Sequence, residues 1–451
     1  MATDPIQRVR EVEHESVLDL DAHHALTRLA ALRPSTEAPY LTVYLDWRPE
    51  GADPGRAPAP PPRPSARRAT REESVSRRPA RQQIERDLAE LVEGHGPRGS
   101  AFESIGVDAE RIGAYLDAEL DPAAQGVVIV ACSAMGVFEP LALGLPVPTR
   151  LAVGPTPALF HLALLLDDHP TYAVLLADQH EANLTLIDQA TPNQGVFLES
   201  SDYPRKQHQG GWSQRRFQAR AGERVAAFAR GIAEETQRAI EEGGVGMLVV
   251  AGDEVITSAL DAAFHPAVKE LIVGTLRLDN QASDQEIVAA TLPLAAQAER
   301  DREAEAVEAV RDAVGAGADG AVGAEATLTA LQSGQVATLV VVDDFVGSGW
   351  ADFAFPLFGV GPVPSEHPAG GDPAALVPIA LEEELVRLAV SSGAEVQIVH
   401  TALPVAAGPD SIPEPGSPLP RAEPAARLDE FGGVGALLRY SLVDDQPTAD
   451  R

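Results

Sequence analysis

Alternating and continuous runs of apolar residues, separated by stretches with helical periodicity, predict a mixed α/β chain. β-Branched and aromatic residues dominate 40–47 and 126–133, as is typical of buried strands. Residues 23–33 and 84–93 instead repeat apolar positions with the period of a helix. The N-terminal part is therefore predicted to be an α/β domain. We interpret 137–154 as an extended connection into the next domain.

A second domain is predicted to begin at residue 155. Two apolar runs, 171–177 and 182–188, are joined by a polar turn and predict a β-hairpin. A polar loop, YPRKQHQGGWSQRRF, follows them. Helical periodicity then continues to about Glu242, where two glycines end it, and the next strand is predicted at 245–252.

Helices and strands alternate with short connections in the last third of the chain, which predicts a small α/β sandwich. The predicted helices are 296–314, 326–334 and 381–393, and the predicted strands are 336–345, 394–400 and 434–443. A Gly- and Pro-rich segment, 347–373, is predicted to be a loop. The sequence therefore predicts three domains, at 1–154, 155–292 and 293–446.

An insertion in the first domain, at about 50–82, is rich in Pro, Arg, Ser and Ala. It offers too little apolar surface to offset the entropy of ordering it, so we predict disorder. The overlapping stretch 56–86 carries nine arginines against three glutamates. It is either an RNA-binding arm or a solvated linker, and the sequence leaves both interpretations open.

The charge of the chain is strongly acidic and unevenly distributed. Its 451 residues include 67 acidic and 35 basic side chains, a net charge of −32. Such a surface repels nucleic acid, so RNA binding requires a local basic patch. Residues 203–220 form one, with Arg205, Lys206, Arg215, Arg216 and Arg220 and no acidic residue.

Several classes of protein are not expected. No apolar run reaches the roughly 18 residues of a membrane span, and the N-terminus lacks an apolar signal core, so we expect a cytoplasmic protein. The single cysteine, Cys132, excludes an internal disulfide framework and is predicted to lie in the core. The acidic groups at 167–168 and 343–344 lack the spacing of metal ligands, so no metal is assigned.

The helix that follows the basic loop has two chemically distinct faces. Arginines share one face, namely Arg216, Arg220, Arg224, Arg230 and Arg238. Apolar side chains share the other, namely Phe217, Val225, Phe228, Ile232 and Ala239. Gly210 and Gly211, just before this helix, give the loop backbone freedom without side-chain bulk. This pattern is typical of a loop that enters a tight polyanionic cavity.

The loop and helix resemble the GGQ loop of the archaeal and eukaryotic class-1 peptide-chain release factors. That loop typically reads Gly-Gly-Gln-Ser-x-x-Arg-Phe, and the matching residues here are Gly210, Gly211, Ser213, Arg216 and Phe217. Further segments are similar in the family's order: 171–188, 326–345, 385–400 and 431–442. The last of these also resembles Pelota-type rescue factors. The resemblance covers about 155–445.

The sequence departs from the family pattern in two ways, and the first, in the loop, resembles the family's bacterial branch. Trp212 occupies the glutamine position, and the nearest glutamine is Gln214. Displaced glutamines are also typical of the related eukaryotic factors that release chains from stalled large subunits. In addition, no Asn-Ile-Lys-Ser codon-reading motif occurs in 1–150, so stop-codon decoding is not expected.

The resemblance implies an RNase H-like core for the middle domain and a fold like kink-turn-binding ribosomal proteins for the third. It implies hydrolysis of peptidyl-tRNA on stalled ribosomes or large subunits, assisted by ribosomal RNA and without a cofactor. Gln214 would orient the water, and Gly210 and Gly211 would shape the tip. The implied RNA-binding residues are Arg205, Lys206, Trp212, Ser213, Arg215, Arg216, Arg220 and Arg224.

The implied partners are the large ribosomal subunit, peptidyl-tRNA and rRNA, with no DNA and no membrane. Two other functions stay open at this point. One is a non-catalytic factor that binds the ribosome or tRNA. The other is an acidic scaffold that keeps the fold and has lost RNA binding, which would lack the steep salt dependence of RNA binding.

Overall fold

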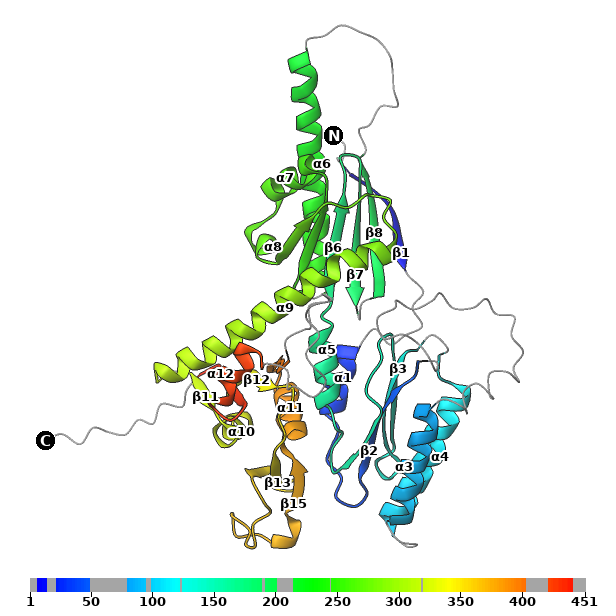
Figure 1. Cartoon of the computed structure of the whole chain (residues 1–451), viewed down its shortest axis with the longest axis vertical. Helices are drawn as coiled ribbons and strands as arrows, with labels where there is room; N and C mark the ends of the chain where they lie inside the picture. The colour runs from blue at the N-terminus through cyan, green and yellow to red at the C-terminus, as the bar shows by residue number, and fades with distance from the viewer. Residues whose placement is uncertain are drawn as a thin grey trace, which may run out of the picture. The chain divides into compact units, whose positions relative to one another are not determined.

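The chain folds into two compact units, which are drawn in Figure 1. The first comprises Met1–Leu20 and Asp168–Glu299, and the second comprises Asp21–Asp167 and Arg300–Arg451. The computed structural model describes residues 6–13, 22–48, 79–94, 99–121, 124–188, 191–200, 214–243, 245–317, 319–402 and 421–440.

A six-stranded mixed sheet forms the centre of the first unit, in the order β1-β8-β7-β6-β9-β10. Its strands are β1 (Ile6–Glu13), β6 (Tyr172–Ala177), β7 (Glu181–Asp188), β8 (Thr191–Ser200), β9 (Leu248–Gly252) and β10 (Ile272–Leu276). Strands β1, β8, β7 and β6 pair antiparallel, whereas β6, β9 and β10 pair parallel. The predicted hairpin is confirmed as β6 and β7.

Helices cover both faces of this sheet. They are α6 (Gln214–Gly243), α7 (Glu254–Ala263), α8 (Pro266–Glu270) and the first part of α9 (Asp284–Gly315). Leu175 of β6 joins the core that contains Phe228 of α6, while its neighbour Val174 joins the core that contains Ile287 of α9. Successive side chains of a strand point to opposite faces, so both faces of β6 are buried.

The second unit contains a four-stranded antiparallel sheet in the order β4-β3-β2-β5. Its strands are β2 (Tyr40–Asp46), β3 (Gly126–Cys132), β4 (Val137–Leu143) and β5 (Arg150–Gly154), and its helices are α1 (Ala22–Ala30), α3 (Pro79–Gly94), α4 (Ser100–Ala118) and α5 (Phe160–Asp168). The interpretation of 137–154 as a connection is wrong, because β4 pairs with β3 and β5 pairs with β2. Two prolines between these strands obscure their pattern in the sequence.

A second four-stranded sheet of this unit has the order β11-β17-β12-β16. Its strands are β11 (Gly320–Val322), β12 (Val336–Val342), β16 (Glu395–Val399) and β17 (Val434–Leu438), and helices α10 (Ala324–Gln332), α11 (Leu381–Ser391), α12 (Glu423–Asp429) and the end of α9 accompany it. The predicted helices and strands of this region are confirmed, although α9 begins well before 296. Its Pro293 lies inside the helix and interrupts the sequence pattern.

The segment predicted as a loop at 347–373 contains strands. β13 (Ser348–Asp352) pairs with β14 (Leu357–Val360) on one side and with β15 (Val377–Ala380) on the other. These strands have at most five residues and are rich in Gly and Pro, so no period-2 pattern identifies them. A buried pair stabilises this small sheet, in which Nε2 of His367 donates to Oδ2 of Asp352 at 3.0 Å.

The predicted division into three domains stays a prediction. In the structure β1 joins the first unit by pairing with β8, and α9 continues through the predicted boundary at 292/293. The insertion predicted to extend to about residue 82 ends earlier, because α3 begins at Pro79 and buries Arg81 beside Asp117. Cys132 is fully buried, as predicted.

None of the helices in the described part of the chain has both the length and the apolarity that crossing a membrane requires.

Candidate nucleic-acid interface

The predicted site lies between β8 and α6 of the first unit. β8 ends at Ser200 and α6 begins at Gln214. Arg205, Lys206, Gly210, Gly211, Trp212 and Ser213 lie outside the described residues. For Gln214, Arg215, Arg216 and Arg220 the structure describes the helical backbone alone, so Arg224 is the first predicted site residue whose side chain is described.

The two-faced character predicted for α6 is confirmed in its described part. Phe228 and Ile232 are at most 1% exposed, and Val225 and Ala239 pack partly against the same core. Arg224, Arg230 and Arg238 face solvent on the other side. The apolar stripe therefore holds the helix on the sheet and turns the arginine face towards solvent.

The N-terminal part of α6 extends past the edge of the sheet (Figure 1). Among the described side chains of α6, the buried large apolar residues run from Phe228 to Ile240. The 30-residue helix is thus anchored along its C-terminal half, and its N-terminal end lies beyond the sheet. A helix of this length spans about 45 Å. The N-terminal part of α6 therefore forms an arm that extends beyond the sheet.

The arginines of α6 differ in how they are paired. Neither Arg224 nor Arg230 forms a hydrogen bond or ion pair with another described residue. Nη1 of Arg238 instead contacts both carboxylate oxygens of Glu235 at 2.9 Å. An unpaired, exposed guanidinium can donate two parallel hydrogen bonds to a phosphate. Arg224 and Arg230 therefore have no partner among the described residues, whereas Arg238 is paired with Glu235.

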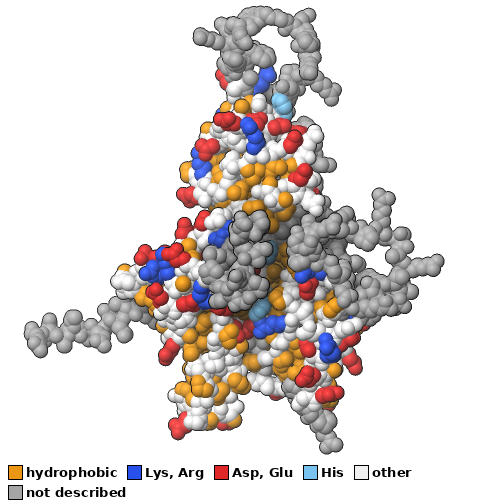
Figure 2. Space-filling model, viewed as in Figure 1, with side chains coloured by type: hydrophobic (Ala, Val, Ile, Leu, Met, Phe, Trp, Pro, Cys, Tyr) orange, Lys and Arg blue, Asp and Glu red, His pale blue; other side chains and the backbone are white. Residues whose placement is uncertain are grey.

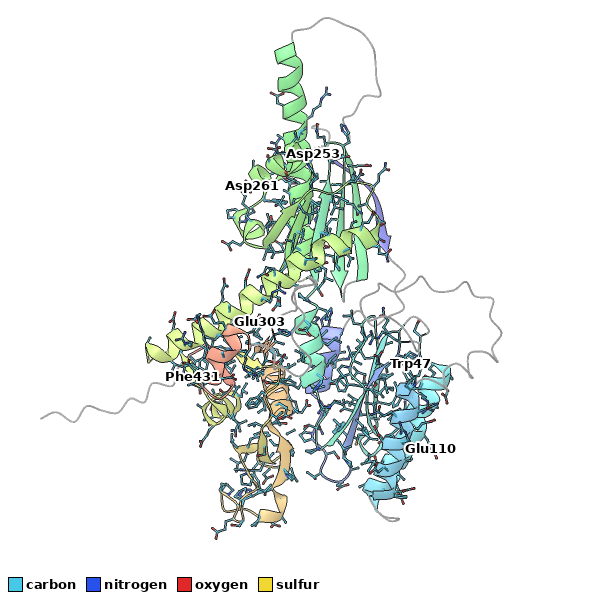
Figure 3. All side chains as sticks on the ribbon, viewed as in Figure 1. Trp47, Glu110, Asp253, Asp261, Glu303 and Phe431 are labelled. Carbon is cyan, nitrogen blue, oxygen red and sulfur yellow. The ribbon has the colours of Figure 1, made fainter. Side chains whose placement is uncertain are left out.

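Acidic side chains outnumber basic ones on the visible face of the first unit (Figure 2). On the face of the molecule drawn in Figure 2, Asp and Glu side chains are spread over this unit among fewer Lys and Arg. Asp253 and Asp261, labelled in Figure 3, lie on the neighbouring segment that forms α7. Oδ1 of Asp253 accepts from the backbone N–H groups of Val255 and Ile256 at 2.7 and 3.1 Å and caps α7. Burial tends to raise the pKa of Asp253, but the hydrogen bonds outweigh it and lower the pKa.

Metal binding finds no support in the described residues. No group of three or more His, Cys, Asp or Glu side chains among them is arranged to hold an ion. Asp167 accepts from the backbone N–H of Ile398 at 3.2 Å, and Asp343 accepts from that of Thr401 at 3.2 Å. Asp344 pairs with Arg421 at 2.9 Å. Each of these three carboxylates thus has a structural partner.

A comparison with protein families gives a match for the segment that contains α6. Residues 157–299 match a family model described as "Bacterial archaeo-eukaryotic release factor family 10". The match contains β6 to β10, α6 and the whole loop before α6. No curated protein matches the chain.

Solved structures of translation factors match over much of the chain at low similarity. Pelota of Archaeoglobus fulgidus is 18% identical, with 72% of this chain and 82% of that chain covered and a TM-score of 0.29. Dom34 of S. cerevisiae, a translation termination-like factor, is 13% identical, with 68% and 75% covered and a TM-score of 0.36. The archaeal translation termination factor aRF1 is 16% identical, with 93% and 98% covered and a TM-score of 0.22.

Proposed function

We propose that this chain, whose residues 157–299 match the model of a bacterial archaeo-eukaryotic release factor family, releases nascent chains from peptidyl-tRNA on stalled ribosomes or large subunits. It would do so without reading a stop codon. The observation that carries this proposal is that the family match contains the complete Gly-Gly loop and the arginine-faced helix behind it.

The proposed reaction is hydrolysis of the ester between the peptide and the tRNA. A water oxygen attacks the ester carbonyl carbon, the bond to the ribose oxygen breaks, and that oxygen receives a proton. The amide of Gln214 does not titrate near neutral pH, so it cannot act as a general base. It would hold the water in line and donate to the developing oxyanion, with the ribosomal RNA completing the site.

The fold of the first unit supports the RNase H-like core implied by the resemblance. Strands β8, β7 and β6 form an antiparallel meander, and β9 and β10 continue the sheet in parallel beyond β6. This sheet anchors α6 through Phe228 and Ile232. A rigid anchor is required if a loop at the end of a long helix is to position a water molecule within a fraction of an ångström.

The test is release of labelled peptide from purified large subunits that carry peptidyl-tRNA. Gln214→Ala is compared with Gln237→Ala, a control on the same helix whose side chain hydrogen-bonds Glu241 at 2.9 Å far from the loop. We expect release by the wild type and by Gln237→Ala, and loss of release with Gln214→Ala. Undiminished release by Gln214→Ala would overturn the role given to that residue.

Trp212 favours a second candidate, a non-catalytic factor that binds the ribosome or tRNA. It replaces the family's glutamine with a side chain that can stack on a base but cannot orient a water molecule as an amide does. Wild-type protein that binds the large subunits and releases no peptide would establish this function instead.

A further inference from the structure

The charge of α6 changes sign along its length. Residues 203–230, the loop and the first part of the helix, carry seven basic residues and a single acidic one, Glu223. Residues 231–243, the rest of the helix, carry four glutamates and one arginine, Arg238. The change takes place between Arg230 and Glu234, one helical turn apart, or about 6 Å along the axis.

The ion pair of Arg238 makes the change of charge along α6 more abrupt. Arg230 is exposed and has no ion pair with a described residue, whereas Arg238 is bound to Glu235 at 2.9 Å. Beyond Arg230, therefore, the helix offers no free cation among its described residues. Glu234, Glu241 and Glu242 all face solvent there.

The helices that follow α6 in the chain carry further exposed carboxylates. α7 packs against α6 in the core that contains Phe228 and Ile256. Glu254 of α7 and Glu270 of α8 are exposed. Lys269, a cation of this region, is paired with Asp261 at 3.2 Å. Glu254 and Glu270 form no ion pair with another described residue, so both carry exposed negative charge in this unit.

We propose that the RNA contact of this protein ends on α6 between Arg230 and Glu234. Arg230 is the last residue that contacts an RNA phosphate, and the glutamates beyond it exclude RNA from the anchored end. This inference rests on the proposed function and specifies how its site meets RNA. The screening length at physiological salt is about 8 Å, so a phosphate beside Arg230 is within reach of the Glu234 charge. RNA can then approach the arm from its tip and not from its base.

The first test is the salt dependence of binding to purified large subunits, measured for wild type, Arg230→Ala and Arg238→Ala. Both variants change the net charge by the same amount on the same helix. Each phosphate contact contributes about 0.7 to 0.9 to the slope of log K against log salt concentration. We expect Arg230→Ala to lower the slope by that amount and Arg238→Ala to leave it unchanged. Equal slopes for the two variants would overturn the inference.

The second test reverses the charge at Glu234. We expect Glu234→Lys to bind large subunits several-fold more tightly and to acquire binding to an unstructured single-stranded RNA, because the RNA contact can then extend along α6. Glu110→Lys is the matched control, since Glu110 is exposed on α4 in the other unit and is labelled in Figure 3. No difference between these two variants would contradict the inference.

These outcomes are distinguishable from failure of the proposed function. If wild-type protein binds large subunits but Arg230→Ala behaves like Arg238→Ala, the boundary is wrong and the proposed function stands. If wild-type protein does not bind large subunits, the boundary on α6 and the proposed function are both wrong. Circular dichroism of each variant verifies that the helix content is unchanged.

Discussion

Glu383 and Phe160 are joined by a hydrogen bond in which the backbone N–H of Phe160 donates to Oε2 of the carboxylate at 2.7 Å. Phe160 is the first residue of α5, and Glu383 lies in the first turn of α11, 223 positions away. The carboxylate thus occupies the N-terminal end of α5, where free N–H groups and the helix dipole favour negative charge. This contact joins the helix that follows the first sheet of the second unit to the helix beside its second sheet.

Removal of the Glu383 carboxylate is expected to destabilise the second unit. Glu383→Ala leaves the buried N–H of Phe160 without an acceptor, which costs about 1–3 kcal/mol. The measurement is urea unfolding followed by a probe in this unit. Glu395→Ala, an exposed site on β16, is the control and should change the free energy of unfolding by less than about 0.5 kcal/mol. Equal stability of the two variants would contradict this account.

The stability of the same unit should depend on pH through Glu383. Burial raises the pKa of Glu383 from 4.5 to about 6, although the Phe160 N–H and the Arg150 charge oppose the rise. The folded state therefore binds a proton that the unfolded chain releases between about pH 4.5 and 6. The contribution of Glu383 to the free energy of unfolding therefore falls by about 2 kcal/mol as the pH rises through this window.

His161 should make the stability of this unit depend on pH in the opposite direction. Burial, and after it the Arg150 charge, lowers the pKa of His161 from 6.5 to about 4. The unfolded chain therefore binds a proton that the folded state rejects, and stability is lost as the pH falls from 6.5 towards 4.

Unfolding measured across pH separates the two residues. We expect Glu383→Gln to lose stability more steeply than wild type on acidification from pH 6 to 4.5, because the His161 dependence is then unopposed. His161→Gln should lose stability less steeply than wild type over the same range, because the His161 dependence is removed. Parallel curves for both variants and wild type would contradict the assignment of these groups.

The anchoring of α6 is open to a direct stability test. Phe228 is 1% exposed in the core between α6 and the sheet, so Phe228→Ala should cost about 3–5 kcal/mol in the free energy of unfolding of the first unit. Ile232→Val, a smaller deletion in the same core, should cost about 0.5–1.5 kcal/mol. Similar losses for the two variants would indicate that Phe228 does not anchor the helix.

Elements with a clear local pattern could be predicted from the sequence. The hairpin β6–β7 has two apolar runs with a polar turn between them, and α6 has separate apolar and arginine faces over many turns. β13 to β15 lack such a pattern because they are short and contain Gly and Pro. Their hydrogen bonds to one another, and not local preference, define them as strands.

Relationships between distant residues could not be predicted. The pairing of β1 with β8 and the contact of Glu383 with Phe160 depend on where the whole chain folds. On the helical wheel Arg230 and Arg238 share one face and look equivalent. The structure shows that they differ, because Glu235 forms an ion pair with Arg238 and not with Arg230. The loop before α6 was identified by its resemblance to a family, and the roles of its residues stay predictions.

The most direct test of the central claim is a single-turnover assay on large subunits carrying peptidyl-tRNA, with binding measured in the same samples. The account predicts that wild-type protein liberates free peptide and deacylated tRNA in equal amounts, and that Gln214→Ala binds equally well and liberates neither. Wild-type protein that binds fully and leaves the ester intact would contradict it.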